Sequence, residues 1–167
     1  AVHALRPALA LEWHFIGPIQ SNKTRPVAEH FAWAHAVDRE KIARRLSEQR
    51  PPHLPPLNIC LQVNVSDEAS KSGVSPAELL ALAQAVVTLP NLKLRGLMAI
   101  PEPTDDVELQ RKPFTLLRQL QQQLADMGIA TDTLSMGMSS DMQVAIAEGA
   151  TIVRVGTAIF GKRDYAK

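Results

Sequence analysis

Short apolar segments rich in β-branched residues alternate along the chain with longer segments in which apolar residues recur every three or four positions. The first pattern is typical of buried strands and the second of amphipathic helices. Six strands are predicted, at residues 13–17, 33–37, 57–65, 92–100, 133–136 and 151–155. Strands that alternate with helices in this way indicate a parallel sheet built from βα units.

Capping residues, prolines and glycines mark the expected helix ends. At 75–78, an N-cap serine, a proline at the first helical position and a glutamate three residues after the cap form a capping box. Asp105 and Asp106 are likewise expected to cap a helix start. The helices are predicted at 22–30, from the N-cap Asp38 to Leu46, from Ser75 onward, from about Pro113 to Gly128, and from Ser139 or Ser140 to Gly149.

The fold class expected from this order is α/β, with residues 1–167 in a single domain. Right-handed βα units of roughly 30 residues form either an open doubly wound sheet or part of an eight-stranded TIM-type barrel. In a barrel, about six of the eight strands are present, so the first two βα units, on the order of 60 residues, are missing.

Composition adds little that is specific. The 167 residues suit one domain with a real core, at 46% hydrophobic and 21% charged residues. A net charge of +1 gives no sign of a nucleic-acid or membrane partner, and no run reaches the ~20 apolar residues of a membrane span. Cys60 is the single cysteine, expected to be buried in a strand. No histidine spacing indicates a metal site, and a cytoplasmic location is expected.

Candidate chemistry lies just after the strands, because ligands of such folds bind at the carboxyl ends of the strands. Residues 137–140 lead into a helix N-terminus, and Gly156 and Thr157 follow the last strand. Free N–H groups and the helix dipole favour an anion there. Ser139, Gly156 and Thr157 therefore predict a phosphate cradle. The structural alternative is an N-cap at Ser139 and a tight turn at Gly156.

Three further side chains have two interpretations each. Arg154 lies in an apolar, β-branched strand, so it needs a polar partner or cavity unless it faces outward to a helix carboxylate. His14 alternates with Trp13 and Phe15, which favours a satisfied interior histidine over a ligand contact. Lys71 follows a strand, and a solvated loop lysine is favoured over a cofactor contact.

Four long motifs, at residues 13–23, 97–101, 134–142 and 153–161, together resemble the pyridoxal 5′-phosphate (PLP) homeostasis protein family. The resemblance covers essentially the whole chain. That family is a single-domain barrel similar to the N-terminal domain of alanine racemase. It binds PLP as a Schiff base to a lysine at the end of the first barrel strand and has no established turnover.

The resemblance implies a set of cofactor contacts. Ser139, Gly156 and Thr157 would hold the phosphate, and Arg154 would face the pyridine nitrogen. A cation there keeps that nitrogen unprotonated and weakens the ring as an electron sink. Further expected neighbours of the cofactor are Ser135, Met98 and Lys71. Neither a catalytic residue nor a metal ligand is expected.

The chain also departs from the family. The motif with the Schiff-base lysine and the asparagine motif of the second strand have no counterpart, and Lys23 follows a different strand. The sequence opens at Ala1 without a methionine, almost directly before a strand. We therefore expect an N-terminally shortened part of a longer protein, with two strand edges unpaired.

Three functions are compatible with these residues. The first is a non-catalytic PLP carrier and regulator, expected to be a monomer that serves PLP-dependent client enzymes. The second is an amino-acid racemase of the same fold, which needs a tyrosine from a separate C-terminal β-domain, whereas Tyr165 in the tail is the one tyrosine here. The third is a barrel that binds another phosphate ester. We expect the carrier, because no such tyrosine-bearing β-domain is predicted within this sequence.

Overall fold

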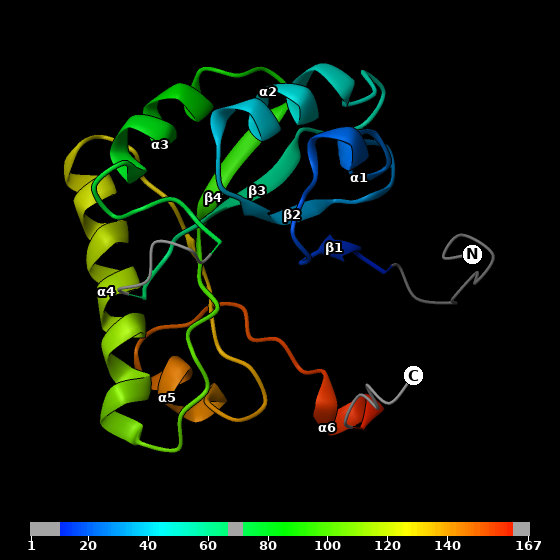
Figure 1. Ribbon diagram of the computed structural model, residues 1–167. Helices are drawn as coiled ribbons and strands as arrows, with labels where there is room; N and C mark the ends of the chain where they lie inside the picture. Colours follow the sequence, from blue (N-terminus) through cyan, green and yellow to red (C-terminus); the bar gives the residue numbers. More distant parts are fainter. Residues whose placement is uncertain (1–10, 67–71, 162–167) are drawn as a thin grey trace.

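The computed structural model describes residues 11–66 and 72–161, and these form one curled sheet with helices on its outer side (Figure 1). The sheet order is β1-β2-β3-β4-β5, and every neighbouring pair is parallel. Strands in sequence order belong to a barrel, because a doubly wound sheet reverses its order at a switch point. The strands are β1 (His14–Phe15), β2 (Trp33–Val37), β3 (Leu57–Gln62), β4 (Leu92–Met98) and β5 (Thr133–Ser135).

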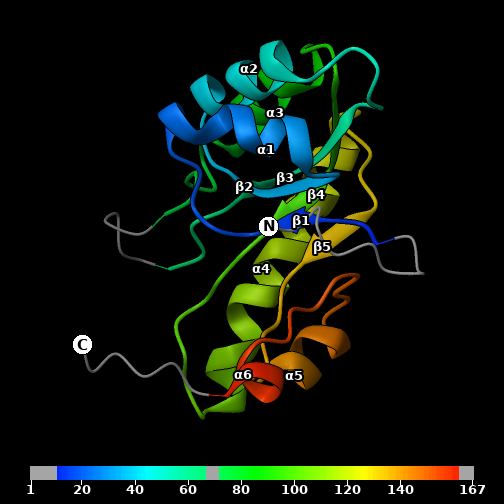
Figure 2. The same ribbon diagram turned by 90° about the vertical axis from the view of Figure 1, so that its right-hand side faces the viewer.

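Helices α1, α2 and α3 lie together on one side of the sheet, and the long α4 runs along its flank (Figures 1 and 2). The opposite side is concave. The His35 side chain of β2 reaches the Ser135 side chain of β5 at 2.8 Å, although two strands separate them in the sheet. The expectation of an incomplete TIM-type barrel is thus confirmed, with five strands in the sheet of the described residues. The helical elements are η2 (Ser21–Lys23), α1 (Thr24–His30), α2 (Glu40–Gln49), α3 (Leu79–Val87), α4 (Val107–Asp126), α5 (Met142–Ala147) and α6 (Thr157–Phe160).

The sixth predicted strand, at 151–155, is wrong. Within the described residues this segment forms a single isolated bridge, between Ile152 and Ser135. The Thr151 hydroxyl accepts the Leu134 N–H at 2.8 Å, so a side chain takes a donor that regular pairing would give to a backbone carbonyl. The segment still runs beside β5, because Met136 N–H donates to the Ile152 carbonyl at 3.1 Å.

Helix α4 begins six residues before the predicted start at Pro113. The Asp106 carboxylate accepts hydrogen bonds from the N–H groups of Glu108 (2.9 Å) and Leu109 (3.2 Å), which confirms its predicted capping role. Pro113 lies inside the helix. The helix continues through Pro113 because its apolar face is packed against the core, with Phe114, Leu117 and Leu120 buried.

Two other predicted helix starts are also wrong. Helix α3 begins at Leu79, and the Ser75 hydroxyl donates to the Glu78 carboxylate at 2.5 Å in place of the side-chain-to-backbone bonds of a capping box. Helix α2 begins at Glu40, with Arg39 rather than Asp38 as its N-cap. The Asp38 carboxylate instead lies 3.3 Å from Nε of Arg39.

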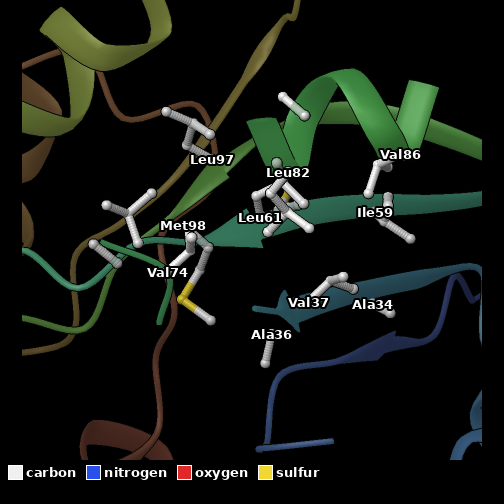
Figure 3. Packing of buried hydrophobic residues seen from close by; sticks show 14 of the residues in the cluster. Ala34, Ala36, Val37, Ile59, Leu61, Val74, Leu82, Val86, Leu97 and Met98 are labelled. Atoms are coloured by element: carbon white, nitrogen blue, oxygen red, sulfur yellow. The ribbon is translucent and has the colours of Figure 1, made fainter. Parts of the chain in front are cut away.

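The core lies between the sheet and its helices. Leu97 and Met98 are consecutive in β4 and point to opposite sides of the sheet (Figure 3). A Cβ atom at Gly96 would lie 1.8 Å from the Thr133 carbonyl oxygen, so glycine is what allows β4 and β5 to approach. Cys60 is fully buried as predicted, and burial raises the pKa of its thiol to about 12. Where the structure describes the chain, it contains no helix suited to crossing a membrane.

Candidate functional site at the carboxyl ends of the strands

Arg154 is the centre of a polar cluster inside the curl. Its side chain is almost fully buried, and Nη1 donates to both the carbonyl oxygen (2.9 Å) and Oγ (2.8 Å) of Ser135. Nη2 donates to the Ala99 carbonyl at 2.9 Å, and Nε lies 3.4 Å from the Met138 sulfur. The polar-partner interpretation of Arg154 is therefore confirmed, and the outward-facing alternative is wrong.

The contacts of Arg154 leave it with capacity for a ligand. A guanidinium has five N–H donors, and its four interactions with described residues leave one N–H on Nη2. Its acceptors are neutral, and no ion pair joins it to a carboxylate of the described residues. Burial lowers the pKa of Arg154, although the group stays a cation. A buried cation with a spare donor favours an electron-rich acceptor.

A row of hydrogen bonds continues from Ser135 to the surface. His35 is fully buried, with Nδ1 2.8 Å from Ser135 Oγ and Nε2 2.9 Å from His14 Nδ1. His14 Nε2 lies 3.1 Å from the Glu12 carboxylate. His14 is thus a satisfied, half-buried histidine, as predicted. Burial, followed by the neighbouring His14 and Arg154, lowers the pKa of His35 to about 4, so the imidazole is neutral.

His35 was missed by the sequence analysis. Its signal was present, because Trp33 and His35 alternate with alanines in β2. In the fold, the His14 ring stacks on Trp33 with centroids 5.0 Å apart. Alternation of that kind marks the inner face of a strand once the outer face is known to be apolar.

Ser139 does not cap a helix. Helix α5 begins at Met142 with Asp141 as its N-cap, and Ser139 lies in the turn before it. Ser139 Oγ is the buried side-chain polar atom that has no hydrogen-bond partner among the described residues. A buried hydroxyl without a partner is costly and indicates a missing ligand or water.

Gly137 shapes this turn. Its φ of +97° is one that side chains rarely adopt, and a Cβ atom there would lie 2.6 Å from the Ala145 Cβ. Gly137 also accepts the Arg154 N–H at 3.0 Å through its carbonyl. The turn with Ser139 is therefore attached to the segment that leads to Gly156.

Gly156 and Thr157 follow that segment and open the single turn of α6. Gly156 is half-buried, Thr157 is exposed, and a Cβ atom at Gly156 would meet no atom of the described residues within 4 Å. The loop after β5 and the segment that leads to α6 run from the same end of the sheet (Figure 1). The assembly of Ser139, Gly156 and Thr157 into one cradle stays a prediction.

The remaining predicted neighbours are placed in part. Met98 and Ser135 are register partners at the ends of β4 and β5, and both are fully buried. Lys71 lies outside the described residues. Lys23 is exposed in η2. Among the side chains that the structure describes, no group of three or more His, Cys, Asp or Glu could hold a metal ion.

Comparisons with known proteins point to one family. The model of the alanine racemase N-terminal domain matches residues 2–164. A pyridoxal phosphate homeostasis protein of Pseudomonas aeruginosa is 68% identical over 157 residues, which cover 94% of this chain and 67% of that relative. The solved structure of PipY from Synechococcus elongatus with PLP bound has a TM-score of 0.77 and 39% identity, over 92% of this chain and 72% of PipY. A D-threonine aldolase from Filomicrobium marinum, at 17% identity and a TM-score of 0.70 over 85% of this chain and 41% of the aldolase, shares the fold alone.

Proposed function

We propose that this chain, which belongs to the pyridoxal phosphate homeostasis proteins within the alanine racemase N-terminal domain family, binds PLP and acts in its homeostasis without turning over a substrate. The observation that carries the proposal is the pairing of a buried cation that keeps a spare N–H with a buried hydroxyl that lacks a partner, both judged among the described residues. Arg154 supplies the first and Ser139 the second. The PLP-bound structure of PipY supports the choice of ligand.

The residues divide into two groups around such a ligand. Ser139, Gly156 and Thr157 would hold the phosphate, because they offer hydroxyls and accessible backbone N–H groups. Arg154 would direct its spare N–H toward the pyridine nitrogen, and Ser135 and Met98 would border the ring. Lys71 is proposed as an outer neighbour. When bound, PLP supplies an electron-withdrawing ring and an aldehyde.

Arg154 also gives a physical reason for weak carbanion chemistry on a bound PLP. A cation beside the pyridine nitrogen disfavours its protonation. An unprotonated ring accepts electrons poorly, so carbanion chemistry is weak. We therefore propose that the protein does not turn over a substrate. Together with this we propose that it is a monomer with a cytoplasmic role in supplying PLP-dependent client enzymes. Measurable racemization of alanine by the full-length protein would overturn the non-catalytic part.

Titration of the full-length protein with PLP tests the binding proposal. We expect saturable binding with a visible absorption band, and Thr157→Val should weaken it about tenfold through loss of a hydrogen bond to a charged group. Thr88→Val is the matched control, because the Thr88 hydroxyl is exposed and bonds the Ala85 carbonyl of its own helix. Equal binding of a simple phosphorylated sugar would instead favour a barrel for other phosphate esters.

A further inference from the structure

We propose that His35 is a positioning residue for Arg154, and that it fixes the guanidinium through the Ser135 hydroxyl as part of one directional chain of hydrogen bonds that ends at Glu12. The inference rests on the proposed function only for the expected effect on PLP binding. This series of hydrogen bonds is formed by the protein's own residues. It links β2 to β5 across the concave side of the sheet, and no sequence motif identifies it.

The groups at the two ends of this series of hydrogen bonds, Arg154 and Glu12, set the direction of every bond in it. Arg154 can only donate, and its Nη1 donates to Ser135 Oγ at 2.8 Å. A Glu12 carboxylate can only accept, and it accepts from His14 Nε2 at 3.1 Å. Between them, the Ser135 hydroxyl donates to His35 Nδ1, and His35 Nε2–H donates to His14 Nδ1. Each group between the two ends, namely the Ser135 hydroxyl and the two imidazoles, then donates one hydrogen bond and accepts one.

The opposite direction is disfavoured by the same count. It would require protons on both ring nitrogens of His14, because Nε2 faces a carboxylate. It would also give Ser135 Oγ two donors, from Arg154 and His35, and leave the hydroxyl proton outside the chain. The neutral Nε2–H form of His35 is therefore the tautomer that satisfies all of the groups.

Glu12 is a firm end point although its side chain is 61% exposed. The same Oε1 atom accepts from His14 and, at 2.9 Å, from the indole N–H of Trp33. Trp33 is buried and stacks on His14. Two donors from β1 and β2 thus hold the carboxylate in place.

The consequence for Arg154 is geometric. With its proton given to His35, Ser135 Oγ presents a lone pair to Nη1, and this bond complements those to the Ser135 and Ala99 carbonyls. Three acceptors in fixed positions define the plane of the guanidinium. That plane determines where the remaining Nη2 N–H points, and so where the pyridine nitrogen of a bound PLP can lie.

The test uses full-length protein with variants that separate the two ring nitrogens. His35→Leu removes both bonds, whereas His35→Asn keeps an acceptor near the position of Nδ1. His53→Asn is the matched control on an exposed loop. Without PLP, nitrogen NMR should show the Nε2–H tautomer of His35 and slow rotation of the Arg154 guanidinium. Rotation should become fast in His35→Leu and stay slow in His35→Asn.

With PLP, His35→Leu should raise the Kd about tenfold and shift the absorption maximum, whereas His35→Asn should stay within about threefold. If His35→Leu does not fold, Ser135→Ala breaks the same link and should give the same results. The Nδ1–H tautomer, or unchanged guanidinium rotation in both His35→Leu and Ser135→Ala, would overturn the positioning role. Wild-type protein that binds no PLP would contradict the proposed function, while the NMR result would still decide the positioning role.

Discussion

The outer side of the sheet packs aliphatic side chains against helices, whereas the inner side carries Arg154, Ser135 and His35 joined by hydrogen bonds. On the outer side the stabilising interaction has no direction and scales with the apolar area removed from water. On the inner side each polar group depends on one partner in one geometry. Substitutions should therefore act through volume on the outer side and through the identity of the bonded atom on the inner side.

The largest effect is expected on the outer side, at Phe114 of α4. Phe114 is fully buried, so Phe114→Ala should lower the free energy of unfolding by about 4 kcal/mol through lost transfer energy and a cavity. Urea unfolding followed by circular dichroism measures this. Leu109→Ala on the same helix is the control, because Leu109 is 50% exposed and should change stability by less than about 0.5 kcal/mol. Similar losses in both variants would contradict the packing assignment.

The next effect is on the inner side and depends on pH. The pKa of His35 is lowered from 6.5 to about 4, so between these values the unfolded chain binds a proton that the folded chain does not. Stability should thus fall as the pH drops from 6.5 to 4, by about 3 kcal/mol for this group.

The measurement for His35 is a series of urea unfolding curves across that pH window. His35→Asn should have a lower stability at neutral pH but a much flatter pH dependence. The other histidines are present in both proteins, so the difference between the two slopes isolates His35. Parallel slopes of stability against pH in the two proteins would mean that folding does not change the pKa of His35. That result would exclude a buried neutral histidine.

A smaller effect is expected from removing the buried cation. Arg154→Met should cost about 2 kcal/mol, because it leaves the Ala99 carbonyl and Ser135 without a donor but also relieves the burial of a charge. Arg111→Met is the matched control, since the ion pairs of the half-exposed Arg111 with described residues are long, at 3.8 and 3.9 Å. A stability gain in Arg154→Met would show that the inner bonds do not offset the cost of burying the charge.

The same contrast explains what could be predicted from the sequence. Strand β2 was predicted at its observed bounds because periodicity reports the burial of apolar side chains, which is local information. The start of α4 was wrong because the prediction gave Pro113 more weight than the Asp106 cap, although both residues were visible. Segment 151–155 was wrong because a strand also needs a regular partner, and the Thr151 hydroxyl interrupts that pairing.

The site was predictable in its members and not in its connections. Arg154 and Ser135 were identified from the family resemblance, and Arg154 also from its place in an apolar strand. The bond between His35 and Ser135 joins residues 100 positions apart on strands that are not neighbours. Only the curl of the sheet brings them together, and strand patterns contain no information on that curl.

The smallest effect on stability is expected at Ser139, where the comparison between the two sides is sharpest. Because Ser139 Oγ has no partner in the described protein, Ser139→Ala removes no bond and relieves the cost of burying an unpaired hydroxyl, so the free energy of unfolding should stay the same or rise by up to about 1 kcal/mol. Affinity for PLP should nevertheless fall about tenfold, since the hydroxyl finds its partner in the phosphate. Ser140→Ala, one residue along in the same turn and exposed, is the control for both measurements. A stability loss above about 1 kcal/mol with unchanged PLP affinity would mean that this hydroxyl serves the fold and not the ligand.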